Sequence, residues 1–151
     1  MNDSIVGQAK TKKDIATFKI PYAPGTLKAV ALQGGQPIGT AERVSAGSDL
    51  KLTLTPEEAP CENAELVFIH VDITDGAGTI ESNVDSLVTV NIEGGELVAF
   101  GSAKQDPEER YHTGTFPTLY GRALAVVRKG DGEVRLTATS ESGLSGETTL
   151  K

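Results

Sequence analysis

Apolar and polar residues alternate along much of this chain, with the period of two that is typical of a β-strand. The clearest run, ELVFIHVDIT at residues 65–74, places four branched apolar residues on one side and Phe68, His70 and Asp72 on the other. Similar but shorter runs lie at residues 50–54, 86–93 and 132–140. Helical spacing is rare by comparison. The pattern predicts an all-β chain whose strands each bury one face.

Residues 120–128, YGRALAVVR, are apolar on both faces in their middle. This is expected of a central strand that is covered on each side. Pro-Gly, Gly-Gly and Asp-Gly pairs separate the strand-like runs, and such pairs favour tight turns. Short strands at this spacing predict an immunoglobulin-like antiparallel β-sandwich, with a barrel as the alternative.

One domain boundary is expected near residues 46–49, AGSD. After it come about seven strand-like runs, which suffice for a complete sandwich of about 100 residues. The segment before it is too short for a sandwich of its own, so its strands should pack elsewhere or leave an apolar face uncovered. We therefore expect a partial sandwich at residues 1–47 and a complete one at 48–151. The candidate strands of the first part are Ile5–Gln8, Ala16–Ile20, Thr26–Leu32 and Pro37–Val44.

Charge and hydropathy exclude two classes of partner. The formal net charge is −7, so the phosphate backbone of a nucleic acid would be repelled. No apolar run approaches the ~18 residues that cross a bilayer, so we expect no membrane partner. Cys61 is the only cysteine, and an internal disulfide is therefore impossible.

The longest loop-like stretch is QDPEERYHTGTF, residues 105–116, and its length makes it the leading candidate for binding. It could contact a sugar or a neighbouring domain through its aromatic rings and carboxylates. A solvated connector is the favoured interpretation, because binding loops are a minority of loops. Aromatic side chains supply large contact areas at interfaces. The candidate docking or sugar-contact residues are Tyr22, Asp106, Tyr111, His112, Phe116 and Tyr120.

Metal and catalytic motifs are weak. His70 and Asp72 share a strand face and could hold a metal with a third ligand, but the sequence has no zinc-type spacing, so an ordinary exposed strand face is favoured. The phrase DITDGAG, residues 72–78, lacks the full calcium-loop pattern, and a hairpin turn is the better interpretation. A Ser-His-Asp arrangement has no motif to support it. We expect no catalytic residue, no metal and no cofactor.

Two parts of the chain resemble C-terminal immunoglobulin-like domains of bacterial glycoside hydrolase family 2 enzymes, the β-galactosidase group. FKIPYAPGTLKAVALQGGQPIGTAERVSAG, residues 18–47, is similar to the closing strands of the domain that follows their catalytic barrel. Residues 50–151 resemble a further C-terminal sandwich, through VFIHVDITDGAGTI, VNIEGGELVAFGS and YGRALAVVRKGDGEVRLTATSESGLSGETTL.

The resemblance implies a non-catalytic accessory region of a β-galactosidase-like glycosidase, which docks on or shapes the catalytic domain. The family's catalysis belongs to a (β/α)₈ barrel of about 250 residues, which this chain cannot contain. Its implied partners are the other domains of the parent enzyme, and we expect that parent to be periplasmic or secreted. Two alternatives are a carbohydrate-binding module and an adhesin-type repeat. The open strand edges could also pair in a homodimer.

Overall fold

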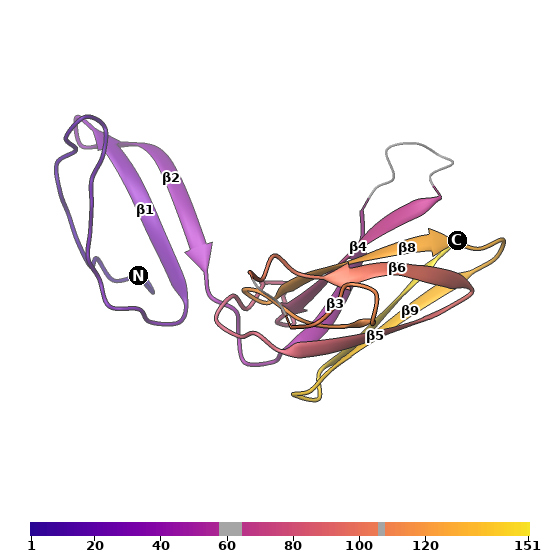
Figure 1. Ribbon diagram of the computed structural model, residues 1–151. Helices are drawn as coiled ribbons and strands as arrows, with labels where there is room; N and C mark the ends of the chain where they lie inside the picture. The colour runs from indigo at the N-terminus through magenta and orange to yellow at the C-terminus, as the bar shows by residue number, and fades with distance from the viewer. Residues whose placement is uncertain (58–64, 106–107) are drawn as a thin grey trace. The chain divides into compact units, whose positions relative to one another are not determined.

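The computed structural model describes residues 1–57, 65–105 and 108–151, and in these ranges every paired strand is antiparallel (Figure 1). The chain divides into two compact units, which we call unit 1 (Met1–Ala46) and unit 2 (Gly47–Lys151). None of the described residues is helical. The all-β antiparallel fold predicted from the alternation is confirmed. Cys61 lies outside the described residues.

Unit 1 contains a single two-stranded hairpin, formed by β1 (Thr26–Gln33) and β2 (Gln36–Val44). Its two glycines, Gly34 and Gly35, make the turn, as the sequence predicted. The start of β1 is fixed by Asn2, whose Oδ1 accepts a 2.8 Å hydrogen bond from the Thr26 backbone N–H. The N-terminal segment is thus tied to the hairpin.

Two predicted strands of unit 1 do not form. Residues 5–8 and 16–20 are extended but belong to no ladder, although Lys12 and Ile15 bridge the turn between them. The prediction was wrong here because a strand is defined by its hydrogen-bonded neighbour, and alternation specifies only which way side chains point.

Unit 2 is a sandwich of two four-stranded sheets. One sheet has the order β10-β9-β5-β7 and the other has the order β3-β4-β8-β6. Their bounds are β3 (Lys51–Pro56), β4 (Leu66–Thr74), β5 (Leu87–Glu93), β6 (Gly95–Gly101), β7 (Thr115–Pro117), β8 (Arg122–Lys129), β9 (Val134–Ser140) and β10 (Ser145–Leu150).

The core of unit 2 lies between these sheets and uses one face of each strand. From Val67 to Ile73 in β4 every second residue is buried, as the alternation predicted, and Thr74 at the end of the strand is buried as well. Phe100 and Phe116 are the largest fully buried side chains, and branched aliphatic residues fill most of the remainder. These include Ile69, Val71, Ile73, Val88, Val127, Val134 and Leu136.

The Asp-Gly phrase after β4 forms a turn, as predicted. The Asp75 carboxylate accepts hydrogen bonds from the backbone N–H groups of Gly47, Thr79 and Ala77, at 2.8, 2.8 and 3.0 Å. The bonds from Gly47 and Thr79 are the main reason that the pKa of Asp75 is lowered from its ordinary value. The carboxylate thereby ties the first residue of unit 2 to the end of β4.

Candidate functional site

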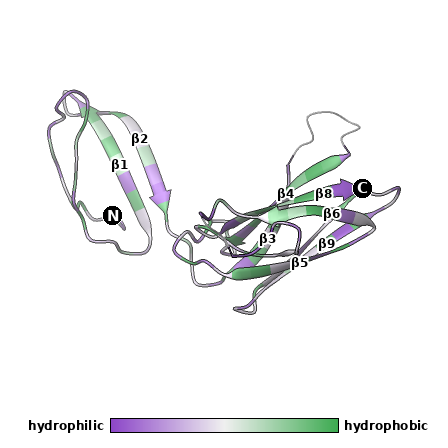
Figure 2. Cartoon of the chain, in the orientation of Figure 1, coloured by the Kyte–Doolittle hydropathy of each residue, from purple (hydrophilic) through white to green (hydrophobic). Residues whose placement is uncertain are grey.

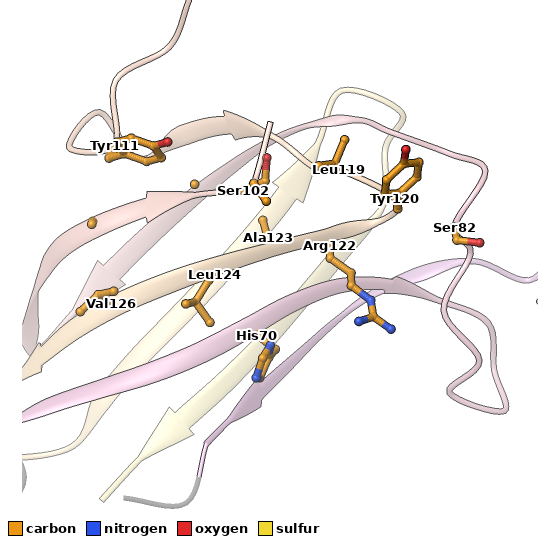
Figure 3. Close-up of a pocket in the computed structure, with 13 residues that line it drawn as sticks. His70, Ser82, Ser102, Tyr111, Leu119, Tyr120, Arg122, Ala123, Leu124 and Val126 are labelled. Atoms are coloured by element: carbon orange, nitrogen blue, oxygen red, sulfur yellow. The ribbon is translucent and has the colours of Figure 1, made fainter. Parts of the chain in front are cut away.

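Unit 2 carries a groove of about 830 Å³ on the outer face of the β3-β4-β8-β6 sheet (Figure 3). Strand β8 supplies much of the floor through Leu124 and Val126, which point away from the core. Their ladder partners on β6 are Gly101 and Ala99, and these small residues also line the groove. The floor is therefore apolar, and the short side chains on β6 keep it open.

The groove corrects the prediction that β8 is covered on both sides. Its inner residues, such as Ala125 and Val127, are fully buried, whereas Leu124 and Val126 are only half-buried among the described residues. Strand β8 is apolar on both faces, as the sequence indicates, but the residues of its outer face line a groove and are not covered by a second core.

Tyr120 projects from the tight turn between β7 and β8. Tyr120 and Gly121 both have left-handed backbones, with φ of 53° and 71°, and Leu119 and Arg122 exchange hydrogen bonds across them. This is the pattern of a two-residue type I′ turn. A side chain at Gly121 would lie 2.3 Å from the carbonyl oxygen of Glu81, so glycine is required there. The turn leaves Tyr120 65% exposed beside the groove.

Tyr111 borders the groove in a different way. Its ring stacks on Phe116, with centroids 4.9 Å apart and ring planes 12° apart. A Cβ at Gly101 would come within 2.2 Å of the Tyr111 ring, so the glycine on β6 makes room for it. Tyr111 remains 48% exposed. Packing on a buried ring therefore fixes the position of an exposed one.

Strands β4 and β8 supply the two basic side chains of the groove, His70 and Arg122. His70 Nε2 lies 2.8 Å from Glu57 Oε1, and this contact orients the imidazole ring. Arg122 on β8 lies opposite Asp72 on β4 in the register of the two strands. Burial raises the pKa of Asp72, while the charges of His70 and Arg122 act in the opposite direction. Among the described residues that line the groove, none is a carboxylate.

The structure separates the six residues singled out in the sequence. Tyr111 and Tyr120 line the same groove. Phe116 is 0% exposed and lies in the core, so its predicted role in docking or sugar contact is wrong. It pairs with Val88 across β7 and β5, and its side chain follows the inward face of that ladder. His112 is exposed but outside the groove.

Two predicted residues lie elsewhere. Tyr22 belongs to unit 1, where it is 71% exposed and its hydroxyl lies 3.4 Å from that of Ser45. Asp106 is outside the described residues. Within the described ranges, no three His, Cys, Asp or Glu side chains gather as a metal site would require. The same ranges contain no helix that could span a membrane.

Sequence reasoning missed the floor of the groove and its polar side, including Leu124, His70 and Arg122 as members of one site. A signal for the floor was present in the two-sided apolar pattern of residues 120–128. No signal in the sequence placed β6 beside β8 or identified Gly101 as the residue that admits the Tyr111 ring.

Comparison with protein families decides the affiliation. Residues 50–149 match the family described as glycoside hydrolase family 2 C-terminal domain 5. The chain belongs to that glycoside hydrolase family 2 domain family. Residues 1–39 match a second family, described as a domain of unknown function, DUF4982. The resemblance stated from the sequence is thereby confirmed.

Individual relatives agree with this glycoside hydrolase family 2 affiliation. The chain is 28% identical over 144 residues to the β-galactosidase BoGH2A of Bacteroides ovatus, covering 89% of this chain and 17% of the relative. A solved family 2 structure from Bacteroides cellulosilyticus is 29% identical, with a TM-score of 0.75, over 87% of this chain and 19% of that one.

A β-glycosidase from Bacteroides vulgatus shares the fold at 18% identity, with a TM-score of 0.70 over 87% of this chain and 18% of that one. The chain thus spans less than a fifth of the length of these relatives. It corresponds to a C-terminal region of a family 2 glycosidase.

Proposed function

We propose that this chain is a non-catalytic accessory region of a β-galactosidase-like glycosidase, and that it packs against other domains of the same enzyme. The family match and the similarity to a Bacteroides ovatus β-galactosidase support this assignment. The small share of those relatives that the chain covers leaves ample protein to serve as its partner.

The observation that carries the proposal is the apolar surface of unit 1. Most of the exposed large hydrophobic side chains among the described residues belong to this unit, and Figure 2 shows hydrophobic colour along β1. An isolated two-stranded hairpin is at best marginally stable in water, and exposed apolar patches mark interaction surfaces. The residues are Ile5, Val6, Ile15, Phe18, Tyr22, Leu27, Val30, Leu32, Ile38 and Val44.

Unit 1 therefore completes an immunoglobulin-like domain whose remaining strands come from another part of the parent polypeptide. Separate family matches for residues 1–39 and 50–149 support this division, since they treat the two parts as different domains. Val30 and Leu32 share one side of β1, because side chains alternate along a strand, and this side would lie against the missing layer.

The chemistry of the groove supports an accessory role over a catalytic one. A retaining glycosidase needs two carboxyl groups about 5–5.5 Å apart on either side of the scissile bond. The described lining of the groove contains histidine, arginine and serine but no carboxylate. Catalysis would thus be supplied by the parent's barrel domain.

The docking role is tested by Val30→Asp, made both in the full-length parent and in this chain. A carboxylate forced into a covered apolar interface costs about 3–5 kcal/mol, so the parent should unfold at a lower urea concentration. In the isolated chain the same side chain is exposed, and the change should be nearly neutral. Gln36→Asp in the exposed hairpin is the matched control. Equal tolerance of both variants by the parent would refute the docking role.

Two further measurements separate the alternatives. The full-length parent should hydrolyse nitrophenyl β-galactoside, while the isolated chain should not, and turnover by the chain would contradict the accessory role. Pairing of two copies through open strand edges would appear as a concentration-dependent mass of the isolated 151-residue chain.

A further inference from the structure

The groove of unit 2 has the dimensions and composition of a small-ligand site. Its volume of about 830 Å³ falls within the range of about 300–1,000 Å³ that is usual for ligand pockets. Such sites combine a mostly apolar lining with a few well-placed polar groups. Here Leu124, Val126 and Ala99 supply the apolar floor, and the polar groups lie along its margin.

Two of the three tyrosines in the chain border this one groove. Figure 3 shows Tyr111 and Tyr120 well separated along it, with Ser102 and Leu119 drawn between them and Leu124 below. Both rings are about half exposed or more. Stacking on Phe116 holds the Tyr111 ring, and the tight turn fixes the backbone from which the Tyr120 ring projects. Held in this way, an aromatic ring offers a flat apolar face together with a polar hydroxyl.

The polar margin is rich in hydrogen-bond donors. Arg122 forms no ion pair within 4.0 Å in the described part of the chain, so its guanidinium donors remain available to a ligand. Ser82 and Ser102 add hydroxyls, which both donate and accept. Glu57 contacts and orients His70. Glu57 follows β3, which lies at the opposite edge of the sheet from β6 and its floor residues. A ligand bearing several hydroxyl groups could pair with this mixed set.

A pyranose sugar has this combination of surfaces, since its ring presents apolar C–H faces and its rim carries hydroxyl groups. A purely apolar peptide segment would bury the donors of Arg122 without partners, which is costly. A cationic ligand is disfavoured, because Arg122 would repel it and the described lining offers no carboxylate to bind it. We propose that the groove of unit 2 binds a glycan chain, with Tyr120 and Tyr111 as platforms for separate pyranose rings of that chain and Arg122 as a hydroxyl-binding donor.

The test uses the intact 151-residue chain, titrated with β-galacto-oligosaccharide, cello-oligosaccharide and oligogalacturonate at millimolar concentrations. The chain has no Trp, so its fluorescence comes from three tyrosines, two of which line the groove. Amide chemical shifts of Gly101, Leu124 and Val126 locate the bound sugar independently. At least one oligosaccharide should change both signals, and preference for the oligogalacturonate would show that Arg122 recognises a carboxylate on the sugar.

Variants link the binding to the groove. Tyr120→Gly removes a ring while keeping a backbone suited to the left-handed position, and it should weaken binding about tenfold or more, a change of 1.4 kcal/mol. Leu124→Lys should obstruct the floor and abolish binding. Tyr22→Ala in unit 1 is the matched control and should bind like the unaltered chain.

The proposal is overturned if none of the three oligosaccharides changes the spectra, or if Tyr120→Gly and Leu124→Lys both bind as the unaltered chain does. Folding of each variant is checked by the dispersion of its amide spectrum. This inference goes beyond the proposed docking role. The two can fail separately, because docking is measured in the full-length parent and sugar binding in this chain.

Discussion

Gly146 lies where an edge of one sheet of unit 2 comes close to an edge of the other. It belongs to β10, the edge strand of one sheet, and faces β3, the edge strand of the other. A Cβ built on Gly146 would lie 2.1 Å from the carbonyl oxygen of Leu52 and 2.9 Å from Cδ1 of Leu54. Its backbone is outside the left-handed region, so alanine itself would be compatible with the local conformation. Any cost of Gly146→Ala is therefore steric.

The size of this cost follows from what must move. The Leu54 methyl group could rotate away, but the Leu52 carbonyl is part of the backbone of β3, and that strand is held in place by its ladder with β4. Relief requires the two edges to separate, which opens the core near Leu52 and Leu54. Overpacking of this kind costs about 1–3 kcal/mol. For a unit of this size the Tm should fall by roughly 4–12 °C.

Thermal and urea unfolding of the chain, followed by tyrosine fluorescence, measures the change. Gly132→Ala is the matched control, because a Cβ at Gly132 meets nothing within 4 Å and its backbone is not left-handed. That control should be neutral or stabilise the chain by up to about 1 kcal/mol, through the lower entropy of the unfolded state. If Gly146→Ala is as stable as Gly132→Ala, β10 and β3 do not approach each other closely enough to exclude a side chain, and the steric argument is refuted.

Three further substitutions test buried polar groups. Thr118→Val leaves the buried Ser86 N–H without its 2.9 Å acceptor and should cost about 1–3 kcal/mol in urea unfolding, whereas Thr139→Val on the exposed face should cost little. Asp75→Ala should lower the free energy of unfolding at neutral pH, because backbone hydrogen bonds stabilise the ionised Asp75 carboxylate in the folded state and so lower its pKa. The difference from the unaltered chain should shrink as the pH falls below 3.8, where the carboxylate is protonated in the unfolded state. Asp72→Asn should change the stability in the opposite direction and raise the Tm at neutral pH. Burial disfavours the ionised Asp72 carboxylate and raises its pKa, so the gain should vanish in acid, where the carboxyl group is neutral. Tm values measured across pH decide both, and equal pH profiles for the two variants would contradict the assignments.

Much of unit 2 could be predicted from residue order alone. The run at 65–74 became β4 (Leu66–Thr74), with the predicted face buried against the other sheet. This worked because a strand with one buried face must alternate, and a shift of one residue would expose every apolar side chain. The turn at Asp75 was also predictable, since a short acidic side chain can accept bonds from the backbone N–H groups that follow it.

The candidate site was less accessible to such reasoning. Tyr111 and Tyr120 were singled out as aromatic candidates and both line the groove, and their role in binding stays a prediction. Phe116 lies in the same sequence neighbourhood and is buried. Composition cannot separate these rings, because the burial of each depends on which sheet face it meets. For Tyr111 the outcome depends on the missing side chain of Gly101, which is distant in sequence.

Apolar residues in this chain exceed what the core between the two sheets uses. Most of the exposed excess among the described residues lies in unit 1, including its hairpin, and a smaller apolar surface lies on the outer face of β8. Single exposed apolar residues are ordinary on a protein surface. A contiguous apolar patch is unfavourable in water, and this free energy is gained back only when another surface or a ligand covers the patch. The two surfaces differ in their polar surroundings. The groove beside β8 has Arg122, which forms no ion pair within 4.0 Å among the described residues, and the hydroxyls of Ser82 and Ser102. The side of β1 that holds Val30 and Leu32 has the Lys28–Glu42 ion pair, whose charges already satisfy each other. This difference is why we assign another protein domain to the hairpin and a hydroxyl-rich ligand to the groove.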